Sequence, residues 1–154
     1  MKSRLLLTPL FAFVLMLVNP AFVYSETTPQ TSPSSPVQID KLTGKELHLK
    51  LVEVAYRYDY YNKRCRGISI SREVNEVNRL FLRKYGITIN NFIKLNIDRD
   101  TRGYQEKVKQ SLYQTLFEMG GCESEQNDPF LKQMQSDYRT LLENAQTSPW
   151  FPRT

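Results

Sequence analysis

Apolar side chains recur at helical spacing along most of the chain, and no other feature of the sequence limits the fold as much. Between Thr43 and Cys65 the apolar residues stand three or four positions apart, so one face of a helix collects them. The same spacing returns in four later segments, 71–86, 88–97, 103–119 and 128–146. Amphipathic helices joined by short loops predict an all-α fold, a small irregular bundle of four to five helices.

Residues that favour helix ends bound these segments. Thr43 and Glu46 have the spacing of a capping box, in which each side chain satisfies a free backbone donor of the other. Gly86 is a fitting stop for the second helix, and Asp128, which a proline follows, is a fitting start for the last. The β-branched residues among 87–89 leave a short strand open as an alternative to the third helix.

The first 25 residues have the order of a secretory signal peptide. Two basic residues, Lys2 and Arg4, precede an almost wholly apolar run from Leu5 to Val18, and Ser25 supplies a small side chain at the expected cleavage point. The apolar run is shorter than the roughly 18 to 20 residues that cross a bilayer, although a retained membrane anchor stays open as the alternative. Cleavage after Ser25 predicts an exported protein of the periplasm or the extracellular space.

The composition divides the chain into four parts around a single domain. Residues 1–25 are the signal peptide, and residues 26–38 form a flexible linker rich in proline, serine and threonine. Residues 39–146 form the helical domain. Residues 147–154 are a C-terminal tail, whose aromatic side chains we expect to fold back onto that domain.

The chain has two cysteines, Cys65 and Cys122. In an oxidising compartment such a pair predicts one disulfide bond, in keeping with the export signal. Two unpaired, buried thiols are the alternative. The sequence has no Cys-x-x-Cys spacing, which argues against a redox-active pair.

The sequence contains no recognisable catalytic or metal-binding motif, so we expect a protein that is not an enzyme and that holds no cofactor or metal ion. Its one histidine, His48, lies beside the apolar face of the first helix, where we expect a surface or boundary position. Residues 98–103 resemble a calcium loop in the placing of their glycine. Arg102 and Lys109, however, stand where that loop needs cation ligands, so the segment is expected to be a turn that caps the next helix.

Tyrosine and basic residues gather at the end of the first helix and on one face of the second, and we expect them to form an interaction surface. Tyr58 and Tyr61 fit the buried face, whereas Tyr56 and Tyr60 are expected to expose their hydroxyl groups. Tyrosines at the core boundary and an ordinary solvated helix face are the alternatives. The expected surface residues are Tyr56, Arg57, Tyr60, Lys63, Arg64, Arg66, Arg72, Arg79, Arg83 and Lys84.

These features favour a non-enzymatic protein-interaction module, such as an inhibitor, an immunity protein or an envelope accessory protein. The basic middle of the chain predicts an acidic protein partner. A formal net charge of +5, two units of which lie in residues 1–25, is too small to predict nucleic-acid binding. Membrane contact is expected only through the signal peptide before its cleavage. The alternative function is a carrier for a lipid or another apolar anionic ligand.

Overall fold

The computed structural model describes residues 38–152. The predicted signal peptide (1–25) and all but the last residue of the predicted linker (26–38) lie outside the described residues. Helices are the only regular elements between residues 38 and 152, so the all-α prediction is confirmed and segment 88–97 forms a helix, not a strand. The elements are the 3-10 helix η1 (Ile39–Lys41) and the α-helices α1 (Gly44–Cys65), α2 (Arg72–Tyr85), α3 (Ile89–Asn96), α4 (Thr101–Glu118) and α5 (Asn127–Thr147).

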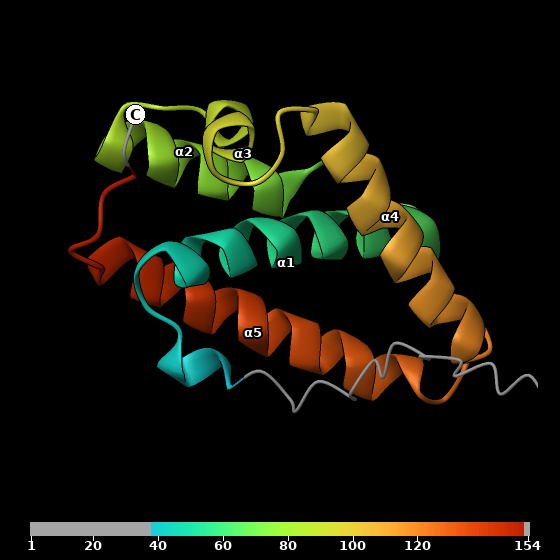
Figure 1. Cartoon of the computed structure of the whole chain (residues 1–154). Coiled ribbons are helices and arrows are strands. Elements are labelled where there is room, and N and C mark those ends of the chain that lie inside the picture. The colour runs from blue at the N-terminus through green and yellow to red at the C-terminus, as the bar shows by residue number, and fades with distance from the viewer. Residues whose placement is uncertain (1–37, 153–154) are drawn as a thin grey trace, which may run out of the picture. The chain divides into compact units, whose positions relative to one another are not determined.

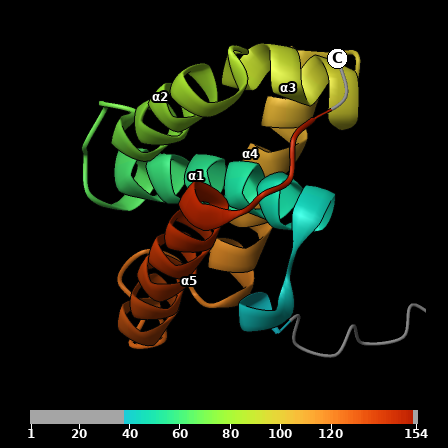
Figure 2. The ribbon, with the colours of Figure 1, turned by 90° about the vertical axis from the view of Figure 1, so that its left-hand side faces the viewer.

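Helix α1 is the axis of the bundle. Figures 1 and 2 show it from two directions, with α2 on one side and α5 on the other. It packs against α2, α4 and α5, and the short helix α3 contacts both α2 and α4. Because three helices cover α1, it buries side chains around most of its circumference and not along a single stripe.

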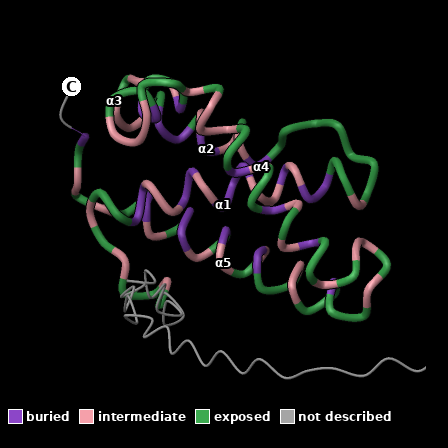
Figure 3. The backbone as a smooth tube through the Cα atoms, turned by 45° about the vertical axis from the view of Figure 1, so that its right-hand side comes forward, coloured by how far each residue is buried: buried purple, intermediate pink, exposed green. Residues whose placement is uncertain are grey.

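Large apolar side chains fill the space between the helices, where Figure 3 shows the buried parts of the backbone. Phe81 of α2 and Phe92 of α3 meet with ring centroids 4.8 Å apart. Leu51, Leu112 and Leu141 reach the same core from α1, α4 and α5 and are fully buried. Burial of each such side chain stabilises the fold by about 1.5 to 3 kcal/mol.

Two helix boundaries agree with the predicted segments 71–86 and 88–97. Gly86 takes the left-handed backbone conformation (φ 70°), which ends α2. Thr88 caps α3, because its hydroxyl accepts a hydrogen bond from the backbone N–H of Asn91 at 3.1 Å. Both signals are local, so the sequence alone is enough to find them.

Two other predicted caps do not form, although α1 does start directly after Thr43, as predicted. Thr43 makes no side-chain capping bond, because the chain enters α1 through Gly44 in the left-handed region (φ 56°) and the capping box does not form. Helix α5 begins one residue before Asp128, which lies in the first turn and is not the cap. The preceding turn causes this early start, since the side-chain amide of Asn127 donates to the carbonyl oxygen of Cys122.

Residues 98–103 form the predicted capping turn. Asp98 accepts a hydrogen bond from the backbone N–H of Asp100 at 2.9 Å, and Asp100 accepts one from the N–H of Gly103 at 3.0 Å. A Cβ atom at Gly103 would collide with the Asp100 carboxylate, which explains the glycine without a bound cation. Asp98 also pairs with Lys107 at 3.0 Å.

The predicted disulfide is present between Cys65 and Cys122, whose Cα atoms lie 5.3 Å apart. It joins the end of α1 to the turn between α4 and α5. Such a bond fits an oxidising, exported location. None of the helices between residues 38 and 152 combines the length and the apolar character that crossing a membrane requires.

His48 is fully buried, so its predicted surface or boundary position is wrong. The imidazole Nδ1 lies 2.7 Å from the carbonyl oxygen of Gly44, and Nε2 lies 2.5 Å from the hydroxyl of Tyr85. Since a carbonyl oxygen only accepts, Nδ1 carries the proton and Nε2 accepts from the tyrosine. Burial lowers the pKa of His48 below its ordinary value, so the ring is held neutral.

The C-terminal tail folds back onto the bundle, as predicted. The ring of Trp150 packs on that of His48 with centroids 4.6 Å apart, and Phe151 lies 5.1 Å from Tyr85. Figure 1 shows the segment after α5 running towards α2 and α3. The tail therefore covers the side of His48 that would otherwise face solvent, which accounts for the burial of the histidine.

Candidate interaction site

A loop of six residues, 66–71, joins α1 to α2, and every one of them is exposed. Gly67 turns the chain out of α1 in the left-handed conformation (φ 66°), while the N–H groups on either side of it donate to the carbonyl of Asn62. Ile68 and Ile70 are 39% and 70% exposed. One isoleucine at a surface is ordinary, but two in one loop make a small apolar patch that a partner can bury.

The loop forms one wall of a groove with a volume of about 460 Å³. We call it the arginine groove, because Arg66, Arg72 and Arg79 lie along it. Its other lining residues are Tyr58, Asn62, Ile68, Ile70, Glu73 and Asn75. The groove thus combines positive charge with aliphatic and aromatic surface.

Among the described residues, little negative charge opposes the three arginines of the groove. Within residues 38–152 none of them forms an ion pair, and Arg66 donates only to the neutral side chain of Asn62, at 3.2 Å. Glu73 is the one acidic residue in the lining, and it is 8% exposed. Guanidinium groups with free donors bind carboxylates well, often through two parallel hydrogen bonds.

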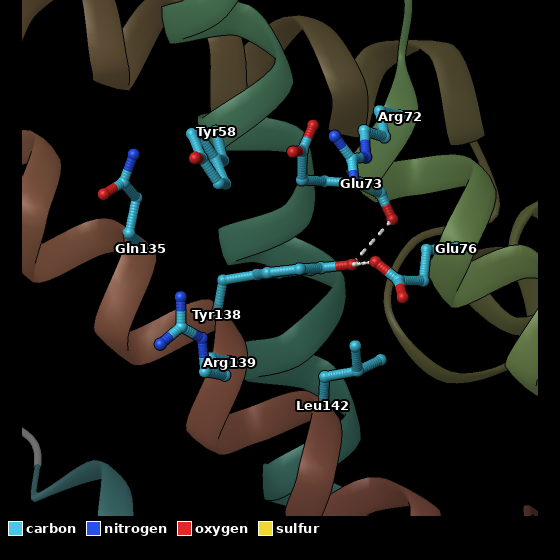
Figure 4. A pocket seen from close by; sticks show the side chains of 8 residues that line it. All are labelled: Tyr58, Arg72, Glu73, Glu76, Gln135, Tyr138, Arg139 and Leu142. Atoms are coloured by element: carbon cyan, nitrogen blue, oxygen red, sulfur yellow. Dashed lines mark hydrogen bonds between the residues drawn. The ribbon is translucent and has the colours of Figure 1, made fainter.

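A second cavity, of about 360 Å³, lies beside the groove and shares Tyr58, Arg72 and Glu73 with it. Figure 4 shows Tyr138 lying across this cavity with its hydroxyl directed at Glu76. The hydroxyl donates to a carboxylate oxygen of Glu76 at 2.9 Å and lies 3.3 Å from the carbonyl oxygen of Glu73. Burial and the bond to Glu76 raise the pKa of Tyr138, which stays neutral and links α5 to α2.

Asp59 and Glu73 are two carboxyl groups buried beneath the arginine groove, with exposed fractions of 4% and 8%. The Asp59 oxygens accept the backbone N–H groups of Glu73 and Val74 at 3.2 and 2.9 Å. Ser71, at the usual capping position, makes no side-chain bond. A side chain of α1 therefore caps α2 and fixes where that helix starts.

The carboxyl groups of Asp59 and Glu73 also lie within hydrogen-bonding reach of each other. Two carboxylates contain no donor, so a bond between them needs a proton on one of them. Burial, followed by this bond, raises the pKa of Asp59 to about 7, although the two backbone N–H groups act in the opposite direction. Among the described residues, Oε2 of Glu73 has no hydrogen-bond partner. Asp59 therefore keeps its proton under mildly acidic conditions and shares it with Glu73 through this hydrogen bond.

The tyrosines of the predicted surface do not all lie where the sequence places them. Tyr56 is only 7% exposed, because α3 and α4 cover that side of α1, and its hydroxyl accepts a hydrogen bond from Gln105 at 2.9 Å. Its predicted exposure is wrong. Tyr61 is buried, as predicted. Tyr60 and Tyr58 are half-buried, and Tyr58 lines the groove.

Several basic residues of the predicted surface lie outside the groove. Arg57 donates to the hydroxyl of Ser111 at 3.3 Å, and the guanidinium of Arg64 lies 5.1 Å from the centre of the Tyr113 ring. The remaining two of this group, Lys63 and Arg83, are exposed. The structure thus brings three of the predicted arginines into the lining of one groove, which the other basic residues of the predicted surface do not line.

Lys84 belongs to the fold and not to an interaction surface. Its Nζ donates to the carbonyl oxygens of Ala145, Gln146 and Ser148 at 2.6, 3.0 and 2.5 Å. These acceptors lie at the end of α5 and the start of the tail, where backbone carbonyl groups lack helical partners. The lysine therefore ties α2 to the C-terminal end of α5.

Sequence reasoning missed the carboxyl pair and the two loop isoleucines. A signal for Asp59 was present, since His48, Val52, Ala55, Asp59 and Asn62 follow one another at helical spacing. Three polar residues on such a stripe are either exposed or paired inside the protein, and all three of these are buried. Nothing comparable in the sequence marks Glu73 as the partner.

In the region from residue 38 to residue 152, no group of three or more histidine, cysteine, aspartate or glutamate residues is placed to hold a metal ion. Comparisons with protein-family models, with curated proteins and with solved structures find no match. The function of this chain therefore has to be inferred from its own residues and their geometry.

Proposed function

We propose that the chain is an exported, non-enzymatic interaction module that binds an acidic protein partner at the arginine groove. An inhibitor, an immunity protein or an envelope accessory protein would work in this way. The observation that carries the proposal is the set of three arginines that form no ion pair with any described residue, beside two exposed isoleucines.

This combination matches what protein interfaces use. Arginine and aromatic side chains dominate interface hot spots, and both types line the groove. The isoleucines of loop 66–71 supply apolar area, while the arginines supply steering and hydrogen bonds to partner carboxylates. A partner segment that presents carboxylates beside one or two aliphatic side chains would complement both.

Export is part of the same proposal. The order of the first 25 residues favours a signal peptide, and the disulfide between Cys65 and Cys122 fits an oxidising compartment. Binding proteins that work there benefit from a stapled fold, because one covalent bond raises the stability of a small domain by several kcal/mol.

The alternative function, a carrier of an apolar anionic ligand, has weaker support. A cavity of about 630 Å³ lies between η1, the start of α1 and the tail, and Leu42, Leu47 and Trp150 give it an apolar character. Its lining contains Asp40 but no lysine or arginine, so an anionic head group would find no opposite charge there. This cavity therefore suits a neutral apolar ligand better than an anionic one.

Affinity capture with the tagged protein from Glu26 onward, against native envelope and secreted fractions, tests the proposal. The variant Arg66→Glu/Arg79→Glu reverses two charges of the groove. A control, Arg83→Glu/Arg99→Glu, makes the same change at two exposed arginines outside it. We expect one stoichiometric protein with the unmodified chain and the control, its loss with the groove variant, and equal melting temperatures for all three.

Salt dependence and lipid analysis complete this experiment. Raising the ionic strength should release the partner, because screening weakens contacts between charged surfaces. A partner that the groove variant still captures would refute the arginine groove as the site. A bound lipid without any protein would favour the carrier function instead.

A further inference from the structure

We propose that the proton shared by Asp59 and Glu73 regulates the arginine groove, so that an acidic partner binds more tightly when the pair is protonated. This inference rests on the proposed function, because the groove is the site that the pair would regulate. The partner should therefore bind more tightly at mildly acidic pH than at mildly alkaline pH.

The position of the pair connects it to the groove in two ways. Glu73 itself lines the groove, directly after the groove residue Arg72 in the chain. Asp59 holds the first turn of α2 through its bonds to the N–H groups of Glu73 and Val74. A change of charge on the pair therefore acts on the electrostatic potential of the groove and on the helix end that carries Arg72.

The groups around the pair do not neutralise a second negative charge. From α2 and α5, the charged neighbours along the adjoining cavity are Arg72, Glu76 and Arg139, and none of them is ion-paired with either carboxyl group within residues 38–152. The phenols that face the pair have raised pKa values and stay neutral; they are Tyr56, Tyr60 and Tyr138. On the side of α3 and α4 the neighbours are uncharged, namely Ile89, Asn90 and Gln105.

The direction of the effect follows from the sign of the charge. With one shared proton the pair carries one negative charge, and loss of that proton adds a second one beneath Arg66, Arg72 and Arg79. The added charge lowers the positive potential that attracts partner carboxylates. It also separates the two carboxyl groups, because the hydrogen bond between them is lost and like charges repel.

A labelled polyglutamate peptide serves as the probe, with binding measured by fluorescence anisotropy from about pH 6 to about pH 8.5. We expect its affinity for the unmodified chain to fall on the order of fivefold over this range, the size that one added charge near a protein surface gives. Glu73→Gln replaces the shared proton with a permanent amide donor to Asp59, so its affinity should stay constant with pH. Glu76→Gln removes the neighbouring carboxylate and should keep the pH dependence.

Carbon-13 NMR of the side-chain carboxyl groups separates the outcomes. If neither carboxyl of the pair titrates above about pH 6, the pair holds no shared proton and the proposal is overturned. If the pair titrates near neutrality but polyglutamate binds with the same affinity at every pH, the proposed regulation is overturned, whereas the groove remains a binding site. If polyglutamate binds at no pH, the proposed function fails, and regulation of the groove fails with it.

Discussion

Because His48 is buried, the protein should lose stability as the pH falls. Burial lowers its pKa in the folded state, while the unfolded chain keeps an ordinary value near 6.5. The unfolded state therefore binds the proton more readily, and the free energy of unfolding falls as the pH drops through about 6.5. The largest slope for one proton is about 1.4 kcal/mol per pH unit.

Asp59 acts in the opposite direction over an overlapping range. Its pKa rises from 3.8 to about 7 on folding, so the folded state binds this proton more readily than the unfolded state does. The free energy of unfolding therefore falls as the pH rises through this range, with the same maximal slope per proton. Just below about pH 6.5 the two effects oppose each other, so the unmodified chain should show a smaller net change there than either group alone would give.

Two variants separate these contributions. Asp59→Asn removes the carboxyl titration, so the free energy of unfolding should rise with pH up to about pH 6.5, with a slope no larger than about 1.4 kcal/mol per unit. His48→Gln removes the histidine titration and should give the opposite slope. Both substitutions lower stability at every pH, so the slope is the quantity to compare.

Urea unfolding followed by tryptophan fluorescence measures these slopes. Trp150 is the only tryptophan of the chain, and its ring lies on that of His48, so its signal reports this part of the core directly. A flat profile for Asp59→Asn just below about pH 6.5 would refute the buried, neutral histidine. A flat profile for His48→Gln would refute the raised pKa of Asp59.

Three further changes have defined effects on stability. Replacing Cys65 and Cys122 by serine opens a loop with a sequence separation of 57 and should lower the free energy of unfolding in urea by about 4 kcal/mol; a loss below about 1 kcal/mol would contradict this. Lys84→Met removes the donor to three carbonyl oxygens and should cost about 2 kcal/mol, with faster removal of the tail by carboxypeptidase. Tyr138→Phe deletes the hydroxyl that binds Glu76 and should cost about 1 kcal/mol, whereas no measurable loss would mean that water replaces this bond equally well.

Much of the helical architecture could be predicted from the sequence, because the signals are local. Apolar spacing placed all five α-helices, and Gly86 and Thr88 marked the boundary between α2 and α3 within a few residues. The disulfide followed from a count of two cysteines together with the export signal. The helices can be inferred from residues that are close together in the chain, and the disulfide can be inferred because two cysteines allow only one pairing.

The errors concern residues whose partners are distant in sequence. Asp59 caps a helix to which it does not belong, and Lys84 binds carbonyl groups more than 60 positions away. His48 is buried because the tail covers it, which the pattern of its own helix does not reveal. Local propensity has no information on such contacts, so the sequence placed Lys84 on a surface and His48 at a boundary.

The candidate site shows the same division. The sequence identified Arg66, Arg72 and Arg79 by type and spacing, and these residues line the groove. It also predicted exposure for Tyr56, which α3 and α4 cover in the folded chain. Composition indicates which residues suit an interface, but only the packing of helices determines which of them meet at one place.

The disulfide has a consequence for how the protein responds to proteases. Cys65 and Cys122 close a covalent ring that contains α2, α3 and α4, and the exposed loop 66–71 lies within it. Exposed loops without regular structure are preferred cleavage sites. A single cut in this loop opens the ring but releases no fragment, since the sulfur–sulfur bond still joins both pieces. The nicked molecule would remain one particle of nearly unchanged mass and would separate into two chains only after reduction and unfolding.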